Sequence, residues 1–546
     1  MNMKTALMVG SWRSVMRTII CFFSAALLLC SADNLIKPDE WKTIPELIVE
    51  LKDGAMTIRT ESEAYGEYRQ LLTVSPAFPK KVRISYRYWT RADMPANASF
   101  AFSWSFFDGD GAALAQNSSY NRLPAAVNGK RMLFSTAVPA GAAKMLVKFQ
   151  PQGPKDGKFI PSFATISDFA VADDGPSKEA LMLIAKPLTR SDRVKRWPDA
   201  PLRGLGIISV APVGGNMQNP GEFISEETFK KFSRWGVNSV RAEVRYDTGG
   251  IWDVKRGEKI PPIPMDDPMA PYKNKIDALR VVLHLAEKYG MSVIIQCEPV
   301  GRRIDVMYQE GDSGGWEKEH IKLWKYIARE FGQHPNVIGY DLLNEPNGKE
   351  EMGRWRNNTL PELCKAVRAL DTNTYLVIEP GPWGLPWGFE NFEPVDDPKV
   401  VYSFHHYMPH SYTHQGLYNY KGTNFENKPY PGMLSRFGDT PDIPWDKNEL
   451  EKSIQAAVDY KKAHNVPIYV GEFSVLRWAP GGAQWLKDSI DLFEKHGMSW
   501  SFHGYGSWNG WNPTYDAADE QNSDTDGGKT TDRLQVLIDG WKKNTR

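Results

Sequence analysis

The segment VIGYDLLNEPNG (residues 337–348) decides the expected fold, together with PIYVGEFSV (residues 467–475). Each begins as a run of apolar, β-branched or aromatic residues without polar alternation, which is typical of a buried strand in a parallel sheet. The runs end in glutamates, Glu345 in Asn-Glu-Pro and Glu472 in Gly-Glu-Phe. A carboxylate is costly to bury at a strand end unless it is paired or used. Two such glutamates in one α/β domain match the acid and the nucleophile that cleavage of a glycosidic bond requires.

Six further segments share the strand pattern, and amphipathic helices are expected between most of them. The segments are RGLGIIS, VNSVRAEV, MSVIIQCEP, TYLVIEPG, VVYSFHHYM and SWSFHGY. Clear helical patterns cover residues 272–290, 316–332, 448–465 and 532–544, whereas the connection after the fifth strand lacks one. Alternating strands and helices over residues 201–546 predict an α/β domain of the (β/α)₈ TIM barrel class. The strand ends would then meet at the face where barrel enzymes build their sites.

Residues 33–175 have a different texture, and we expect an all-β sandwich domain there. Short strand candidates such as KVRISYRYW, ASFAFSWSFFD, AKMLVKFQPQG and FATISDFAVAD are separated by Gly, Pro and Asn. No long helical period interrupts them, as in antiparallel sandwiches. Residues 176–200 are predicted to be a linker of mixed helix and coil. The accessory domain could bind carbohydrate or give structural support, and exposed Trp89 or Trp104 would favour binding.

Residues 1–32 are predicted to be a signal peptide. Arg13 and Arg17 precede the apolar run IICFFSAALLLC, which ends at small residues and is too short to span a membrane. The protein is therefore expected to be secreted, or periplasmic or at the cell surface, and lipidation of Cys30 is an alternative. Cys297 and Cys364 remain after processing and are expected to be buried thiols, since two isolated cysteines form no disulfide framework.

Composition argues against several classes of partner. Lys+Arg and Asp+Glu both total 66, so the absence of net charge gives no support for a nucleic-acid partner. No later segment is apolar enough for a stable membrane span. The 19 Trp and 22 Tyr suit large aromatic cores or platforms on which sugars stack. We expect a monomer with a polysaccharide or oligosaccharide substrate and with no cofactor or metal, because no Cys/His spacing suggests zinc.

The barrel resembles glycoside hydrolase family five, the cellulase-type retaining glycosidases. The resemblance covers residues from about 200 to 546 and depends on Asn344-Glu345-Pro346 after strand four and Gly471-Glu472-Phe473 at strand seven. It implies that Glu345 is the general acid and then the general base, that Glu472 is the nucleophile, and that Asn344 binds the sugar 2-hydroxyl.

Strands two and six carry further residues of this resemblance. Arg241 resembles the family arginine that orients the nucleophile, although a buried pair with Glu243 stays open as its role. In SFHHYMP, strand alternation places His405 and Tyr407 on one face and His406 on the other. The family pattern then implies that His405 contacts substrate and Tyr407 contacts the nucleophile. Since His406 faces away, we expect it to be a packing residue.

Two positions depart from the family pattern. Strand three ends in Gln296-Cys297-Glu298 where the family has a substrate-binding histidine, so Glu298 or Gln296 occupies that place. On strand eight, His503 stands where a tryptophan is usual, and Trp508 is a candidate for the displaced sugar platform. Trp383 and Trp387, in PGPWGLPWG, are further platform candidates.

Together these features predict a secreted retaining β-glycosidase, most simply an endo-β-1,4-glucanase. The alternatives are a β-mannanase, an exo-acting β-glucosidase, or a non-catalytic carbohydrate-binding protein. A metal-dependent barrel hydrolase would need a His-any-His pair on strand one, which RGLGIIS lacks. Schiff-base chemistry would need an inward lysine at a strand end, and the eight segments supply none.

Overall fold

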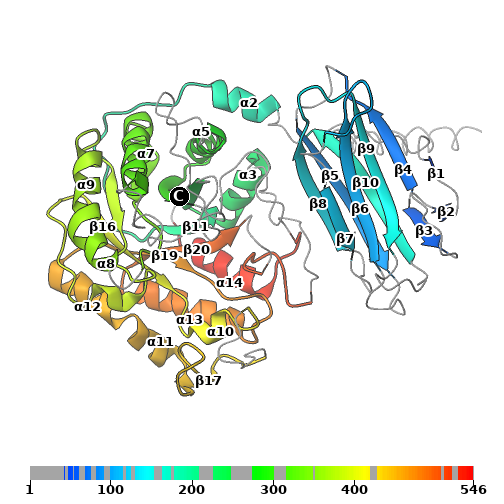
Figure 1. The fold of residues 1–546 in the computed structure, drawn as a ribbon. Helices are drawn as coiled ribbons and strands as arrows, with labels where there is room; N and C mark the ends of the chain where they lie inside the picture. Colours follow the sequence, from blue (N-terminus) through cyan, green and yellow to red (C-terminus); the bar gives the residue numbers. More distant parts are fainter. Residues whose placement is uncertain are drawn as a thin grey trace, which may run out of the picture. The chain divides into compact units, whose positions relative to one another are not determined.

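In the computed structural model the chain forms two compact units, residues 1–175 and 176–546 (Figure 1). The structure describes residues 42–43, 47–52, 55–60, 68–75, 81–90, 99–114, 119–123, 130–152, 163–173, 178–207, 225–246, 273–299, 315–347, 351–417, 427–505, 510–518 and 527–544. The predicted signal peptide, with Cys30, lies outside these residues.

The first unit is built from antiparallel strands in two five-stranded sheets. One sheet has the order β1 (Lys42–Thr43), β4 (Tyr68–Thr73), β9 (Lys144–Gln152), β6 (Ser99–Phe107) and β7 (Ser119–Leu123). The other has the order β2 (Leu47–Lys52), β3 (Ala55–Thr60), β10 (Phe163–Asp173), β5 (Lys81–Thr90) and β8 (Lys130–Ala137). The four strands predicted from sequence correspond to β5, β6, β9 and β10.

Aromatic side chains connect the two sheets. The ring of Tyr86 on β5 lies 4.9 Å from that of Phe102 on β6 and 5.2 Å from that of Phe149 on β9. Trp104 is buried and packs against Phe102 and Phe134. Large rings on alternate inward positions thus fill the space between the sheets.

The second unit contains a closed parallel barrel of eight strands, as predicted. In order around the barrel they are β11 (Arg203–Ile207), β12 (Ser239–Tyr246), β13 (Ser292–Pro299), β14 (Val337–Asp341), β15 (Tyr375–Ile378), β16 (Val400–His406), β19 (Ile468–Phe473) and β20 (Ser499–Tyr505). β20 pairs with β11 and closes the ring. The strands are buried on both sides because helices cover the barrel, which explains their continuous apolar sequences.

Helices surround the barrel strands in Figure 1. They are α2 (Lys178–Ala185), α3 (Glu226–Trp235), α5 (Lys273–Lys288), α7 (Gly315–Phe331), α8 (Glu351–Arg354), the π-helix η4 (Trp355–Thr359), α9 (Leu360–Arg368), α10 (His410–Thr413), α11 (Lys447–Ser453), α12 (Gln455–His464), α13 (Gly482–Lys495) and α14 (Asp532–Trp541). The helix predicted over residues 448–465 is divided into α11 and α12 at Ile454, whose side chain is fully buried.

The last helix, α14, is hydrogen-bonded to β11, the first strand of the barrel. Thr531 caps α14 by accepting a hydrogen bond from the Leu534 N–H at 3.1 Å. Trp541 is fully buried, and its indole N–H donates to the Gly204 carbonyl of β11 at 3.1 Å. Residues more than 300 positions apart are thereby joined at the seam of the barrel.

The connection after β15 departs from the regular β/α pattern, as the sequence suggested. It contains only the 3₁₀ helix η5 (Pro386–Phe389) among its described elements. Elsewhere, β17 (Gly432–Leu434) and β18 (Ile443–Trp445) form a small hairpin between β16 and α11. Cys297 on β13 and Cys364 on α9 are buried thiols that form no disulfide, as expected.

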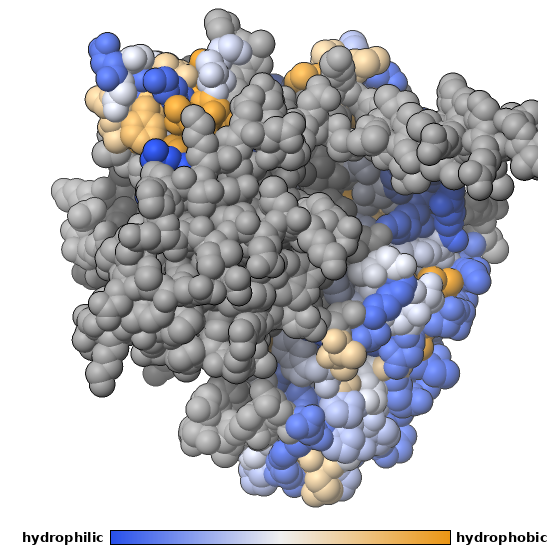
Figure 2. All heavy atoms as spheres, turned by 90° about the vertical axis from the view of Figure 1, so that its right-hand side faces the viewer, coloured by the Kyte–Doolittle hydropathy of each residue, from blue (hydrophilic) through white to orange (hydrophobic). Residues whose placement is uncertain are grey.

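On the face that Figure 2 shows, the described surface carries hydrophilic residues with smaller groups of hydrophobic ones between them. Trp383 is the one aromatic residue among the exposed large hydrophobic side chains of the described ranges. Within the same ranges, no helix has the length and apolarity required to cross a lipid bilayer.

Candidate active site

Glu345 and Glu472 meet at the carboxyl ends of the barrel strands. Glu345 follows β14 by four residues, and Glu472 is the fifth residue of β19. One carboxylate oxygen of each and a ring nitrogen of His405 all lie within 4.8 Å of one another. The side chain of Glu472 is 7% exposed and that of Glu345 is 29% exposed, so the two carboxylates have unlike surroundings.

Arg241 on β12 is the centre of the buried charge network. Its guanidinium is fully buried and lies 2.6 Å from Glu472 and 3.3 Å from Glu243. The remaining contacts are to Asp341 at 2.8 Å, to the Asn344 side-chain oxygen at 2.8 Å and to Glu379 at 3.8 Å. Both partners expected for Arg241, Glu472 and Glu243, are therefore present. A fork of five N–H donors suits one arginine to such a set.

The surroundings of Glu472 favour its ionised form. Tyr407 donates its hydroxyl hydrogen to Glu472 Oε2 at 2.9 Å, and His503 Nδ1 lies 3.3 Å from the same oxygen. Burial raises the pKa of Glu472, but the charges of His405, His503 and Arg241, with the Tyr407 hydrogen bond, outweigh burial and hold this pKa well below its usual range. An ionised carboxylate at neutral pH is the form that can act as a nucleophile.

His405 lies between two glutamates. Its Nδ1 is 2.8 Å from Glu345 Oε1, and its Nε2 is 3.1 Å from Glu379 Oε1. Burial lowers the pKa of His405, whereas the carboxylates of Glu379, Glu472 and Glu345 raise it, and the result lies well above the ordinary value. The imidazole is therefore positively charged near neutral pH.

The alternation predicted for strand six is confirmed. His405 and Tyr407 face the glutamates, whereas the ring of His406 stacks on Trp485 of α13 with 5.2 Å between ring centroids. Burial lowers the pKa of His406 to about 3, which keeps it neutral. His406 is therefore a packing residue between the barrel and its outer helices.

Two tryptophans border the site. Trp383 is 46% exposed, has a φ of +55°, and donates its backbone N–H to the carbonyl of Pro346, the residue after Glu345. Trp511 lies 5.8 Å from the ring of Tyr407 and 6.5 Å from that of His503. The predicted platform Trp508 lies outside the described residues.

The two positions that depart from the family pattern fall at the same end of the barrel. Gln296 is fully buried and is in register with Glu243 on one side and Asp341 on the other. His503 on β20 approaches both Glu243, at 3.5 Å, and Glu472. Glu298 belongs to β13, but its side chain is outside the described part of the structure.

The same residues contain two groups with possible metal-ligand spacing. They are Glu243, Glu472 and His503, and Glu345, His405 and Glu472. The Arg241 guanidinium already contacts both Glu243 and Glu472. In the first group, the Arg241 guanidinium thus already supplies the positive charge that a metal ion would otherwise bring to the two glutamates.

Sequence reasoning missed Glu379, Asp341 and Trp511. The signal for Glu379 was present, because TYLVIEPG also ends its apolar run in a glutamate. The signal for Asp341 was a carboxylate inside the apolar run of β14, where a buried charge needs a partner. Trp511 gave no comparable signal, since Trp508 occurs in the same Gly- and Asn-rich loop.

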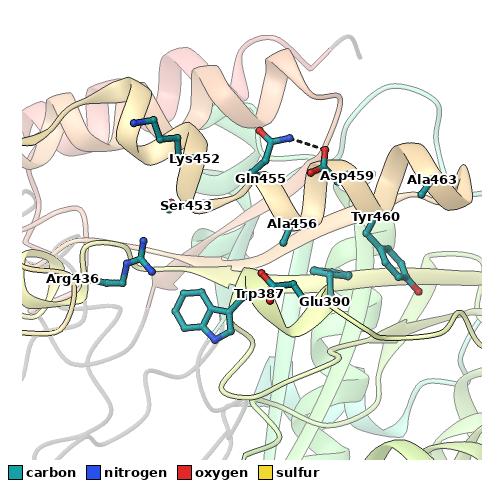
Figure 3. A pocket seen from close by; sticks show the side chains of 11 residues that line it. Trp387, Glu390, Arg436, Lys452, Ser453, Gln455, Ala456, Asp459, Tyr460 and Ala463 are labelled. Atoms are coloured by element: carbon teal, nitrogen blue, oxygen red, sulfur yellow. Dashed lines mark hydrogen bonds between the residues drawn. The ribbon is translucent and has the colours of Figure 1, made fainter. Parts of the chain in front are cut away.

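A separate cavity lies on the flank of the barrel and contains neither glutamate. It has a volume of about 540 Å³ and lies between η5 with the residues that follow it and helices α11 and α12 (Figure 3). Trp387 and Arg436 lie toward one end of it and Tyr460 toward the other, and Gln455 donates to Asp459 on its wall at 2.7 Å. Trp387 is thus a wall residue of this cavity.

The family model for Cellulase (glycosyl hydrolase family 5) matches residues 209–521, more than half of the chain. Endoglucanase C of Acetivibrio thermocellus is 24% identical over 309 residues, which cover 51% of this chain and 84% of the relative. Cellodextrinase A of Ruminococcus flavefaciens is 25% identical over 314 residues, which cover 55% and 85%. A structure of Thermotoga maritima Cel5A with cellobiose has 22% identity and a TM-score of 0.47, and covers 62% of this chain and 97% of that one.

Proposed function

This chain belongs to glycosyl hydrolase family 5, the cellulase family, and from that premise we propose that it cleaves a β-linked glucan with retention of anomeric configuration. The observation that carries the proposal is the closeness of Glu345 and Glu472, whose nearest oxygens lie within 4.8 Å. Retaining glycosidases separate their two carboxyl groups by about 5 Å, whereas inverting ones leave roughly 6.5–9.5 Å for a water molecule.

In the first step, Glu472 attacks the anomeric carbon as Glu345 gives a proton to the leaving oxygen. The glycosidic C–O bond breaks, and an ester to Glu472 forms. In the second step, Glu345 takes a proton from water, the water oxygen attacks the anomeric carbon, and the ester bond breaks. Tyr407 and Arg241 hold the Glu472 carboxylate for attack, at 2.9 Å and 2.6 Å. Asn344, whose side-chain oxygen accepts a hydrogen bond from Arg241, would bind the sugar 2-hydroxyl.

We further propose that the substrate is a β-1,4-glucan cut within the chain. The name endoglucanase of one relative supports cleavage within a glucan chain, and the name cellodextrinase of another supports a cello-oligosaccharide rather than a β-mannan. Trp383, exposed and bonded through its backbone to Pro346, and Trp511, next to Tyr407, offer flat apolar faces on which pyranose rings could stack. His405, His503 and Glu298 would supply polar contacts to the same sugars.

The decisive experiment is proton NMR of the first product formed from a soluble β-1,4-linked cello-oligosaccharide. We expect the β-anomer to appear first and then to mutarotate. Initial release of the α-anomer would reject double displacement. New reducing ends, measured on cellulose derivatives, mannan, xyloglucan and β-1,3-glucan, would test the substrate, and equal activity on all four would reject the assignment.

For the remaining parts of the chain we propose secretion, directed by residues 1–32, and a supporting role for a β-sandwich at residues 33–175. Burial of Trp104 between Phe102 and Phe134 supports packing rather than sugar binding at that position. The Trp89 side chain is outside the described part. The N-terminal sequence of the exported protein, and retention of the isolated first unit on insoluble cellulose, would test these two proposals; strong retention would reject the supporting role.

A further inference from the structure

Glu379 is a buried carboxylate to which the two-step reaction gives no task. It is the first residue after β15, and its side chain has no exposed surface. A buried carboxylate is expensive unless charge and hydrogen bonds compensate it. Its contacts with both the backbone of the proposed acid and the charged histidine indicate what this compensation serves.

Both oxygens of Glu379 connect to Glu345, by two routes. Oε2 accepts the backbone N–H of Glu345 at 2.9 Å. Oε1 faces His405 Nε2 at 3.1 Å, and the other nitrogen of that ring lies 2.8 Å from Glu345 Oε1. The contacts among the three residues form a closed loop. Glu379 contacts the backbone of Glu345 directly, and it contacts the Glu345 carboxylate indirectly, because the His405 ring lies between the two carboxylates.

We propose that Glu379 is a positioning residue that holds Glu345 in place and balances the charge of His405 beside it. This inference rests on the proposed role of Glu345 as acid and base. Glu379 acts through its contacts with Glu345 and His405, without contact with the substrate.

The backbone of Glu345 needs such an anchor. Its φ is +46°, in the left-handed region that residues with side chains seldom occupy, so surrounding contacts must hold the conformation. Asn347 donates to the Glu345 carbonyl at 2.9 Å, and Glu379 accepts from its N–H. Gly384 packs directly against Glu379 and His405, since a Cβ at that position would lie 2.8 Å from Glu379 Oε2 and 3.0 Å from His405 Cγ.

The charge of Glu379 matters because His405 offers a ring nitrogen to each of two carboxylates. Nδ1 is hydrogen-bonded to Glu345 Oε1, whereas Nε2 faces Glu379 Oε1 as a charge contact at 3.1 Å, and both carboxylates favour the protonated ring. The first chemical step requires a proton on Glu345, and the positive charge of the ring lies beside that carboxyl group. The negative charge of Glu379 lies on the other side of the ring and balances it. The charged or titratable groups that face this pair from the neighbouring strands are Arg241, Asp341, Tyr407, Glu472 and His503.

The test compares Glu379→Gln with the matched control Glu390→Gln, an exposed glutamate in the same connection. The amide keeps the shape of Glu379 but removes its charge. We expect kcat/KM on an unactivated cello-oligosaccharide to fall about tenfold or more, since proton transfer contributes roughly 10²–10⁴-fold. On 2,4-dinitrophenyl β-cellobioside, whose leaving group needs no proton, the loss in the first chemical step should be less than about threefold. The alkaline limb of the pH profile should move to lower pH.

The variant Glu379→Asp separates the effect of the charge from the effect of side-chain packing. It also provides the test if Glu379→Gln does not fold. It retains the negative charge but is one methylene shorter, so the alkaline limb should stay near that of the wild type while the rate falls. A limb that does not move in folded Glu379→Gln, or equal losses on both substrates, would overturn the inference.

Glu345→Ala distinguishes this failure from failure of the proposed function. If Glu345 is the acid, Glu345→Ala must lose far more activity on the oligosaccharide than in the first step with the dinitrophenyl substrate. Absence of that contrast would reject the acid assignment itself. Its presence, together with wild-type behaviour of Glu379→Gln, would reject only the role of Glu379.

Discussion

Positively charged residues, above all Arg241, allow many carboxylates to lie close together at the carboxyl ends of the barrel strands. Five described carboxylates gather there: Glu243, Asp341, Glu345, Glu379 and Glu472. Burial lowers the pKa of Arg241, but its four carboxylate neighbours raise it well above the usual value, so this cation is permanent. Burial raises the pKa of Asp341 to about 6, although Arg241 opposes the shift. Because a lysine could not offer donors in a planar fork, Arg241→Lys would leave some of these groups unpaired.

Replacement of Glu472 by Gln should abolish turnover. No other described carboxylate approaches both Tyr407 and Arg241 in this way, and an amide is a poor nucleophile. Glu472→Gly should regain activity on an activated aryl glycoside when azide enters the vacated space. Glu362→Gln, an exposed change on α9, is the control. A Glu472→Gln protein with kcat near that of the wild type would refute the nucleophile assignment.

The same residue should link stability to pH. The pKa of Glu472 is lowered from 4.5 in the folded protein, so the unfolded chain binds its proton more readily. Its contribution to stability is therefore present above about pH 4.5 and is lost as pH falls below that value. Wild type should exceed Glu472→Gln in unfolding free energy at pH 6–7, and urea titrations should show the two values converging toward pH 3. A constant difference would contradict the coupling.

Among the elements, the connection after β15 contributes several residues to the site although it has no regular α-helix. It supplies Glu379, Gly384 and Trp383, and Gly384 also accepts the His405 N–H through its carbonyl at 2.6 Å. Close backbone contacts hold this connection together, in addition to the packing of η5 on α12. A Cβ on Gly388 would lie 1.9 Å from the Gly381 carbonyl oxygen, so η5 fits against the start of its own connection only with glycine at this position.

Gly388→Ala should therefore lower the unfolding free energy by about 1–3 kcal/mol, the usual cost of overpacking. It should also lower kcat, because displacement of residue 381 disturbs the segment that holds Trp383. Gly353→Ala is the control, since that glycine on α8 has open space around it. Denaturant titration and kinetics of both variants test the effect, and equal stabilities would show that the connection can relax.

The sequence was informative about elements because each barrel strand is buried on both sides and so has an uninterrupted apolar pattern. Alternation within one strand also assigned His405, His406 and Tyr407 to the correct faces. Contacts between strands were harder to predict. The two contacts of Glu379 depend on the left-handed backbone of Glu345 and on the distance between β15 and β16, and no local pattern encodes either. The same holds for Trp511, whose position depends on the path of a loop.

At the scale of the whole molecule, the predicted linker contacts the barrel at several points, although most of its described residues are exposed. Lys195 is buried, and its ammonium donates to the Gly332 carbonyl at 2.7 Å and to the Thr374 hydroxyl at 2.8 Å. Burial is the main cause that lowers the pKa of Lys195 to about 8. Earlier in the segment, α2 belongs to the second unit and packs on α5, with Ala180 in the barrel core.

This packing decides where the first unit can be removed. A truncated protein that begins at Pro176 keeps α2 and all eight barrel strands, and it should cleave soluble cello-oligosaccharides with kcat/KM within about twofold of the full chain, because no group of the charge network is lost. One that begins at Pro187 lacks α2 and leaves apolar surface of α5 uncovered, so its unfolding temperature should be lower by several degrees. Circular dichroism and kinetics of both proteins decide the matter. A Pro176 protein that is folded but inactive would mean that the first unit shapes the substrate cleft, whereas equal stability of the two would show that α2 contributes little to the barrel.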